Sequence, residues 1–133
     1  PHRRKSRVVR AAADPGNGLP RKVLVVDDEP DLVELARVLL GYYGMDVCVA
    51  HGGVEALEML AGDPDIDALF SDVMMPGMNG LELADATYLR YPHIHILLTS
   101  GYTAPELAGP YRRRYAYIPK PYRIEDVIAR LRR

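Results

Sequence analysis

The chain has 133 residues with one cysteine, and its 17 Lys and Arg nearly balance its 18 Asp and Glu. This length suits one domain with a substantial core, and the single Cys48 excludes an internal disulfide and lacks partners at metal-ligand spacing. No apolar run is long enough to span a membrane and no signal-peptide pattern occurs, so we expect a soluble, cytoplasmic domain without membrane contact.

The first 20 residues are basic, lack apolar periodicity and contain a turn-forming run, Asp-Pro-Gly-Asn-Gly, at 14–18. We interpret residues 1–20 as a flexible linker or tail and residues 21–133 as the folded domain. The chain begins with Pro rather than Met, so we expect a processed protein or, as the favoured interpretation, a fragment of a longer one.

Short apolar segments alternate with segments of helical periodicity through the rest of the chain. The predicted strands are 22–26, 45–50, 66–71, 93–98 and 115–118, and the predicted helices are 30–43, 54–61, 80–88, 104–108 and 124–131. The second strand alternates polar and apolar residues, as strands near a sheet edge do. In the third helix we expect Leu81, Ala84 and Tyr88 to face inward. Gly109 and Pro110 cut the fourth helix short.

This alternation of strands and helices predicts an α/β fold. We expect a flavodoxin-like, doubly wound sheet of five parallel strands in the order 2-1-3-4-5, with helices on both faces. Four of the strands end at residues with polar side chains: the first at Asp27 and Asp28, the third at Asp72, the fourth at Thr99 and the fifth at Lys120. The carboxyl ends of parallel strands lie at one edge of the sheet, so these side chains should share one pocket.

The distribution of charge supports a cation site in the centre of the chain. Residues 23–110 hold fifteen Asp and Glu but only Arg37 and Arg90 as basic residues, whereas the two ends hold the other Lys and Arg. The basic ends lack interleaved aromatic residues and any helix-turn-helix or zinc pattern, so we expect no nucleic-acid binding.

Several carboxylates in one pocket repel each other unless a cation compensates them. Lys120 supplies one positive charge, and Mg2+, which prefers oxygen ligands, would balance the remaining negative charge of the carboxylates. An acidic nucleophile, a metal, a hydroxyl and a lysine are the groups needed for phosphoryl transfer to a carboxylate, with Asp72 as the candidate nucleophile. Each residue alone has an ordinary structural explanation, and it is their joint position at four strand ends that indicates a site.

The same residues resemble the receiver domain of bacterial two-component response regulators. The resemblance covers roughly residues 21–133, and its motifs are Val-Val-Asp-Asp-Glu-Pro at 25–30, Ser-Asp-Val-Met-Met-Pro-Gly-Met-Asn-Gly at 71–80, Leu-Thr-Ser-Gly-Tyr at 98–102 and Pro-Lys-Pro-Tyr at 119–122. It implies that Asp72 accepts a phosphoryl group from the phosphohistidine of a histidine kinase or histidine phosphotransfer domain. The domain would then be a phosphoacceptor that catalyses its own modification and not a conventional enzyme.

The resemblance also assigns roles to the other residues. It implies that Mg2+ is bound by Asp27, Asp28, Asp72 and the backbone carbonyl of Met74. It implies that Thr99 and Lys120 hold the phosphoryl oxygens, and that Tyr117 turns inward when Thr99 moves.

Within this family, the 98–102 motif and the short fourth helix are most similar to receivers at the C-terminus of hybrid histidine kinases. We therefore expect a hybrid-kinase fragment without an output domain in this chain. A standalone single-domain response regulator is the alternative. A less favoured one is a phosphohydrolase that forms an aspartyl phosphate, because dehalogenase-like phosphatases place their two acids two residues apart, whereas Asp27 and Asp28 are adjacent.

Two structural expectations complete the sequence analysis. We expect a cis peptide bond between Lys120 and Pro121, because an X-Pro bond is held cis at a cost of only about 0.5 to 1 kcal/mol. We also expect that phosphorylation does not drive dimerisation through the fourth helix, fifth strand and fifth helix. The fourth helix is too short, and the positive charges of residues 112–114 would repel those of a second copy.

Overall fold

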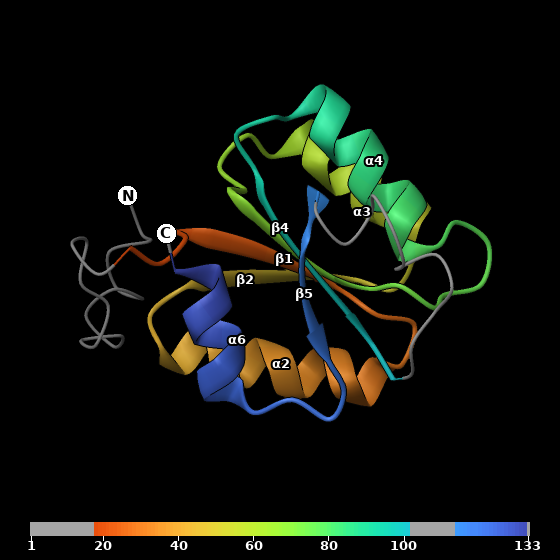
Figure 1. The fold of residues 1–133 in the computed structure, drawn as a ribbon. Helices are drawn as coiled ribbons and strands as arrows, with labels where there is room; N and C mark the ends of the chain where they lie inside the picture. Colours follow the sequence, from red (N-terminus) through yellow and green to blue (C-terminus); the bar gives the residue numbers. More distant parts are fainter. Residues whose placement is uncertain (1–17, 102–113, 133) are drawn as a thin grey trace.

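A computed structural model of the protein describes residues 18–101 and 114–132. Five parallel strands form one sheet in the order β2-β1-β3-β4-β5, as predicted (Figure 1). The strands are β1 (Lys22–Val26), β2 (Asp46–Ala50), β3 (Ala68–Asp72), β4 (His95–Ser100) and β5 (Ala116–Pro119). The helices among the described residues are α2 (Pro30–Tyr42), α3 (Gly53–Gly62), α4 (Gly80–Arg90) and α6 (Ile124–Leu131).

Helices cover both faces of the sheet. Figure 1 shows α2 and α6 on one face and α3 and α4 on the other. Each face has its own hydrophobic cluster, with Leu24, Leu69 and Leu98 in the cluster beneath α3 and α4, and Val25, Phe70 and Leu97 in the cluster beneath α2 and α6. Alternate residues of each strand thus enter opposite clusters, so the central strands are apolar throughout, as in other parallel sheets.

β2 lies at the edge of the sheet and is only partly buried, as its alternating pattern predicts. Cys48 occupies the middle of this strand, where its thiol contacts the carbonyl oxygen of Val23 at 3.7 Å. Burial raises the pKa of the Cys48 thiol above its usual value. We therefore interpret Cys48 as a structural thiol, protonated at neutral pH.

The prediction that Tyr88 faces the core is wrong. Its side chain is 50% exposed, and the buried positions of α4 include Leu83 and Thr87 instead. Thr87 tolerates burial because its hydroxyl donates a hydrogen bond to the carbonyl oxygen of Leu83 at 2.8 Å. Tyr88 lies at the margin of the helix, where its ring contacts the ring of Tyr115 edge-on and the guanidinium of Arg114 lies 5.4 Å from its centroid.

The start of α4 is fixed by a reciprocal pair of hydrogen bonds. The Asn79 side chain accepts a hydrogen bond from the backbone N–H of Glu82, and the Glu82 side chain accepts one from the N–H of Asn79, both at 2.9 Å. This capping box satisfies two backbone donors of the first helical turn. It also fixes the end of the loop that begins at Asp72.

We expect Asn79→Ala to lower the free energy of unfolding by about 1 kcal/mol, because the helix loses its N-cap acceptor. Urea denaturation of the metal-free protein measures this loss. The exposed turn residue Asp65 offers a matched control, since Asp65→Ala removes a similar side chain from a position outside any helix. Equal stability of the Asn79 variant and the wild type would show that the cap contributes nothing.

The predicted fourth helix, at 104–108, lies outside the described residues, as do Arg112 and Arg113. The expectation about dimerisation therefore stays a prediction. Arg114 is described, and its guanidinium lies 3.7 Å from the carboxylate of Asp85 within the same chain. Among the helices of the described segments, none combines the length and hydrophobicity required to cross a bilayer.

Candidate functional site

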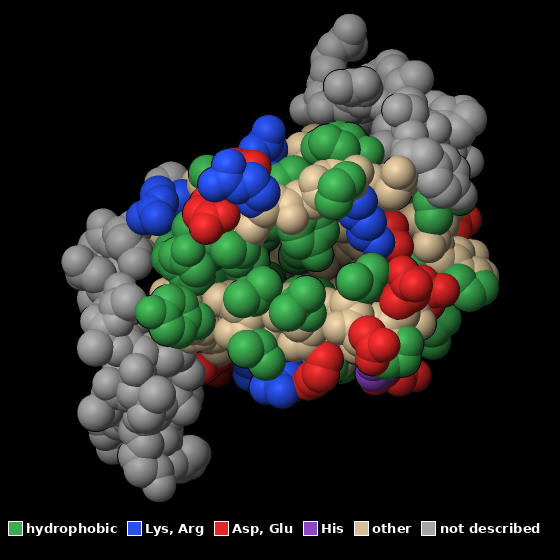
Figure 2. Space-filling model, turned by 90° about the horizontal axis from the view of Figure 1, so that it is seen from below, with side chains coloured by type: hydrophobic (Ala, Val, Ile, Leu, Met, Phe, Trp, Pro, Cys, Tyr) green, Lys and Arg blue, Asp and Glu red, His purple; other side chains and the backbone are tan. Residues whose placement is uncertain are grey.

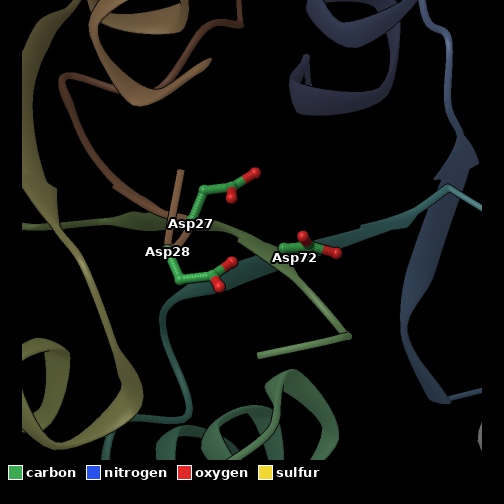
Figure 3. A group of neighbouring side chains, drawn as sticks. All are labelled: Asp27, Asp28 and Asp72. Atoms are coloured by element: carbon green, nitrogen blue, oxygen red, sulfur yellow. The ribbon is translucent and has the colours of Figure 1, made fainter. Parts of the chain in front are cut away.

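Three carboxylates gather at the carboxyl ends of β1 and β3. Val26 of β1 pairs with Ser71 of β3, so the residues that follow them, Asp27 and Asp72, lie side by side. Each of Asp27, Asp28 and Asp72 offers a carboxylate oxygen within 4.8 Å of the others (Figure 3). The structure thus brings together the three acids that the sequence placed in one pocket.

Asp72 is the last residue of β3 and is only 6% exposed. One of its carboxylate oxygens accepts a hydrogen bond from the backbone N–H of Met74 at 3.2 Å, and the other accepts one from Lys120 Nζ at 3.1 Å. Burial raises the pKa of the Asp72 carboxyl above its usual value, and the hydrogen bond and charge of Lys120 only partly oppose this shift.

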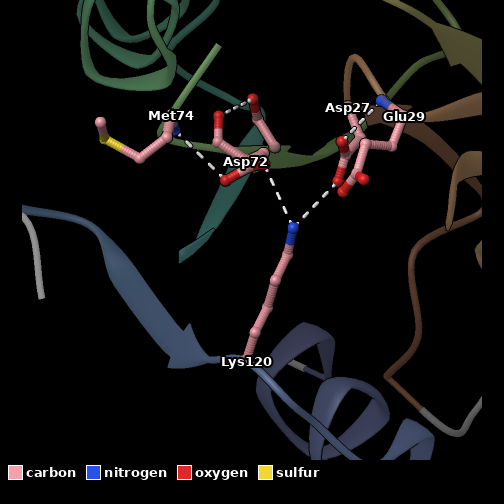
Figure 4. Close-up of polar contacts among 6 residues, drawn as sticks. Asp27, Glu29, Asp72, Met74 and Lys120 are labelled. Atoms are coloured by element: carbon pink, nitrogen blue, oxygen red, sulfur yellow. Dashed lines mark hydrogen bonds and ion pairs between the residues drawn. The ribbon is translucent and has the colours of Figure 1, made fainter. Parts of the chain in front are cut away.

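Lys120 reaches into the pocket from the end of β5, and its ammonium lies between Asp27 and Asp72 (Figure 4). Its Nζ is 3.2 Å from Asp27 Oδ2 and 3.1 Å from Asp72 Oδ2. Burial alone would lower the pKa of Lys120, but the two carboxylates outweigh burial and raise it. The ammonium therefore stays charged at neutral pH.

The backbone on both sides of Lys120 fixes its position. Its N–H donates to the carbonyl oxygen of Ser100 at 2.9 Å, which extends the pairing of β4 with β5 by one residue. The following peptide bond, Lys120–Pro121, is cis, which confirms the expectation from the sequence.

The two adjacent acids after β1 have different environments. Asp27 is 6% exposed, binds Lys120, and accepts a hydrogen bond from the backbone N–H of Glu29 at 3.0 Å. Asp28 is exposed. Adjacent residues at a strand end point in different directions, so Asp27 belongs to the buried ion pair whereas Asp28 presents its oxygens to solvent.

Thr99 lies directly across from Asp72, because the two residues are paired in the register of β3 and β4. Its side chain is 3% exposed, and its hydroxyl has no hydrogen-bond partner among the residues that the structure describes, 18–101 and 114–132. A buried hydroxyl without a partner costs about 1 to 3 kcal/mol, so such a group calls for an explanation, and an acceptor oxygen that arrives with a bound group is one.

The remaining predicted residues are Met74 and Tyr117. Met74 lies two residues after Asp72, and its backbone N–H already contacts the Asp72 carboxylate. Tyr117 on β5 pairs in register with Leu98 and packs, partly buried, against the cluster beneath α3 and α4. It is not a member of the acid cluster, so any role of Tyr117 is exerted through packing and not through direct contact with the three carboxylates.

An apolar groove of about 460 Å³ lies next to the pocket, between α2 and the connection from β5 to α6. Its lining includes Leu32, Leu35, Leu39, Tyr122 and Ile124, with Lys120 among the lining residues. Figure 2 shows apolar side chains gathered around this hollow. The groove was not predicted, because helical periodicity alone does not distinguish a residue beneath a helix from one at its margin.

The backbone amides of Glu29 and Met74, which both donate to the acids, were also missed as functional groups. No side-chain pattern marks them, because the interaction belongs to the main chain.

Comparison with known proteins gives the family. A family model described as the response regulator receiver domain matches residues 23–132. The chain belongs to this family. Receivers take a phosphoryl group from histidine kinases and bind Mg2+, and the acid cluster described above is consistent with both properties.

Individual relatives agree with the family assignment. The response regulator MprA of Mycobacterium ulcerans (strain Agy99) is 42% identical over 113 residues, which cover 84% of this chain and 48% of MprA. The chain thus spans about half the length of the curated relatives it matches. The finer expectation from the sequence was a likeness to the C-terminal receivers of hybrid histidine kinases, and it stays a prediction. These relatives are named as regulators and not as hybrid kinases.

Solved receiver structures share the fold. A response regulator receiver domain protein of Clostridium thermocellum superimposes with a TM-score of 0.77 at 25% identity, covering 83% of this chain and 90% of that one. The response regulator TrrA of Thermotoga maritima, solved in complex with Mg(2+)-BeF, superimposes with a TM-score of 0.69 at 29% identity, covering 80% of this chain and 92% of that one.

Proposed function

We propose that this receiver domain accepts a phosphoryl group onto Asp72 from the phosphohistidine of a histidine kinase or histidine phosphotransfer domain, and that it changes conformation in response. The observation that carries the proposal is the surroundings of Asp72. Its carboxylate contacts the Lys120 ammonium at 3.1 Å and lies across from Thr99, whose buried hydroxyl has no partner within the described part of the chain. A phosphoryl group on Asp72 would place acceptor oxygens next to this hydroxyl.

The donor atoms of the pocket fit Mg2+. Carboxylate oxygens are ligands that Mg2+ prefers, and three of them meet here from Asp27, Asp28 and Asp72. We propose that these three, with the Met74 carbonyl, hold the ion. When bound, it would neutralise charge on the transferring phosphoryl group.

We propose the following roles for the side chains in the transfer. A carboxylate oxygen of Asp72 attacks the phosphorus of phosphohistidine, the P–N bond breaks, and its electrons return to the imidazole. Lys120 and Thr99 hold the oxygens of the phosphoryl group. When the Thr99 hydroxyl moves toward its new acceptor, it leaves space near Tyr117 in the neighbouring strand, and the ring of Tyr117 turns inward.

The proposed function is tested by incubating the protein with acetyl phosphate, with and without Mg2+, and measuring its intact mass. We expect the gain of one phosphoryl group that depends on Mg2+ and is lost in mild base, as an acyl phosphate is. Turnover of small phosphate esters distinguishes this function from the alternative, a phosphohydrolase that forms an aspartyl phosphate. Steady hydrolysis of such esters without accumulation of a labelled protein would support that alternative instead.

We further propose that residues 21–133 are the signalling domain and residues 1–20 a linker. A place in a response regulator is supported by the names of the relatives and by the half of their length that this chain matches. The hybrid-kinase origin is the second candidate, supported by the 98–102 motif. The reading frame on both sides of this segment decides between them, since a histidine kinase core upstream would establish the hybrid origin.

Thr99→Val should separate function from stability. Valine keeps the shape of threonine but removes a buried hydroxyl that has no partner in residues 18–101 and 114–132, so we expect the metal-free variant to be as stable as the wild type or more stable, by up to about 1 kcal/mol. We expect its labelling by acetyl phosphate to slow by about tenfold or more, because a phosphoryl oxygen loses its donor. Urea denaturation and the labelling rate measure the two effects.

Thr87→Val is the matched control, since the Thr87 hydroxyl is buried but does donate a hydrogen bond, to Leu83. It should lower stability and leave the labelling rate per folded molecule unchanged. A Thr99 variant that loses stability and labels at the normal rate would contradict the role given to this hydroxyl.

Asp28→Asn should weaken Mg2+ binding about tenfold or more, because loss of even an outer-shell partner of a metal ligand costs about 10- to 100-fold. Asp28 is exposed and Asp27 is held by Lys120, so we expect Asp28 to contribute more of the affinity than Asp27. Calorimetric titration with Mg2+ measures the affinity of Asp28→Asn and, for comparison, of Asp27→Asn. Undiminished affinity in Asp28→Asn would remove Asp28 from the proposed ligand set.

A further inference from the structure

The first turn of α4 touches the main chain of Asp72. A Cβ atom on Gly80 would lie 2.1 Å from the carbonyl oxygen of Asp72 and 2.8 Å from the Cα of Val73. Both neighbours are backbone atoms, at the last residue of β3 and the residue that follows it, and they cannot rotate away as a side chain would. Only glycine therefore allows α4 to pack this closely behind Asp72.

The same contact closes the loop between β3 and α4. The Gly80 N–H donates to the carbonyl oxygen of Val73 at 2.9 Å, so the loop of residues 74–79 leaves and returns at one point. This loop carries Met74, whose N–H contacts the Asp72 carboxylate. The position of Gly80 thus fixes the direction of the Met74 peptide relative to the carboxylate.

A second group holds the Asp72 main chain. The Ser71 side chain is fully buried, and its hydroxyl donates to the Asp72 carbonyl oxygen at 2.9 Å. The carbonyl that lies against Gly80 is therefore also hydrogen-bonded by Ser71. Two independent contacts, one steric and one polar, restrain a single peptide group at the end of β3.

We propose that Gly80 and Ser71 are positioning residues for the phosphoacceptor. They hold the Asp72 peptide and the closed loop so that the Asp72 carboxylate and the Met74 main chain face the site together. This inference rests on the proposed function, in that the carboxylate they position is taken to be the phosphoryl acceptor. Neither residue touches the transferring group itself.

The principal test is Gly80→Ala. We expect its labelling rate by acetyl phosphate, at saturating Mg2+ and per folded molecule, to fall by about tenfold or more, because displacements near 1 Å cost up to about a hundredfold. In the metal-free protein we expect the NMR amide signal of Met74 to shift. We expect Ser71→Ala to change both quantities in the same direction but less.

Two controls separate positioning from stability. Gly41→Ala adds a methyl group on α2 where nothing lies within 4 Å, so it should leave labelling and the Met74 signal as in the wild type. Leu131→Ala removes a buried side chain from the last turn of α6 and lowers stability without approaching the pocket. It should leave the labelling rate per folded molecule unchanged.

The outcomes are distinct. Normal labelling and an unshifted Met74 signal in both Gly80→Ala and Ser71→Ala overturn the inference. A fall in the labelling rate of Leu131→Ala equal to that of Gly80→Ala overturns it as well. If Gly80→Ala does not fold, Ser71→Ala decides alone. If the wild type is not labelled at all, the proposed function fails, while the metal-free Met74 signal still shows whether Gly80 and Ser71 set the loop.

Discussion

Substitution of Asp72 by Asn is expected to abolish labelling by acetyl phosphate or by a phosphohistidine donor. The rate should fall by at least about a thousandfold, as it does when enzymes lose their nucleophile. Asp72 alone ends the central strand within reach of both Lys120 and the Thr99 position, so no other carboxylate of the cluster can replace it. Asp65→Asn, which removes an exposed carboxylate from a turn, is the matched control and should label normally.

The same variant should not lose stability, which distinguishes loss of the nucleophile from unfolding. The pKa of Asp72 is raised in the folded state, mainly by burial, so its ionisation destabilises the metal-free fold as the pH rises through that pKa. Asp72→Asn should therefore melt at a higher temperature than the wild type at pH 7. The difference should shrink as the pH falls below the usual range of an aspartate, where both proteins are neutral at this position. If Asp72→Asn melts at a lower temperature than the wild type at pH 7, the ionised Asp72 carboxylate does not destabilise the metal-free fold, contrary to this prediction.

Substitution of Lys120 by Met has the second large expected effect. It leaves two nearly buried carboxylates without their cation, and breaking a buried ion pair in this way costs about 3 to 5 kcal/mol. We expect a loss of this order for the metal-free protein at pH 7, measured by urea denaturation. The labelling rate should also fall by about a hundredfold, the usual cost of removing one donor to a developing negative charge.

Two comparisons sharpen the Lys120 prediction. Lys22→Met breaks an ion pair with Asp63 that is about 30% exposed, so it should cost no more than about 1 kcal/mol. The penalty in Lys120→Met should also shrink toward pH 4, because protonation of Asp72 relieves the repulsion. A penalty equal to that of Lys22→Met, or one independent of pH, would show that the Lys120 ammonium does not stabilise the acids.

The sequence predicts the sheet and most of the pocket because the end of a strand indicates two things, where the strand stops and which side chain enters the pocket. An apolar run that stops at Asp72 shows where a strand ends and which side chain stands there. In a parallel sheet the neighbouring strand ends then follow from strand order alone. The acid cluster and Lys120 were predictable in this way. The cis bond after Lys120 was predictable on another ground, the low cost of holding an X-Pro bond cis.

Other features depend on packing that no local pattern records. Tyr88 fits the helical stripe that predicts burial, but α4 packs with Thr87 buried instead, and the hydrogen bond from the Thr87 hydroxyl within the helix makes this burial tolerable. The contact of Gly80 with Asp72 depends on how closely α4 approaches β3, which spacing along the chain does not give. The surroundings of the Thr99 hydroxyl, which finds no acceptor among the described residues, likewise depend on packing in three dimensions.

The central claim, that Asp72 is the phosphoacceptor, is tested most directly by locating the modified residue. Protein treated with acetyl phosphate and Mg2+ can be reduced with borohydride, which converts an aspartyl phosphate to homoserine, and then sequenced by tandem mass spectrometry. We expect homoserine at position 72, and none in samples without Mg2+. Homoserine at position 27 or 28 with an unchanged Asp72, or no homoserine in a protein whose intact mass shows a phosphoryl group, would contradict the assignment.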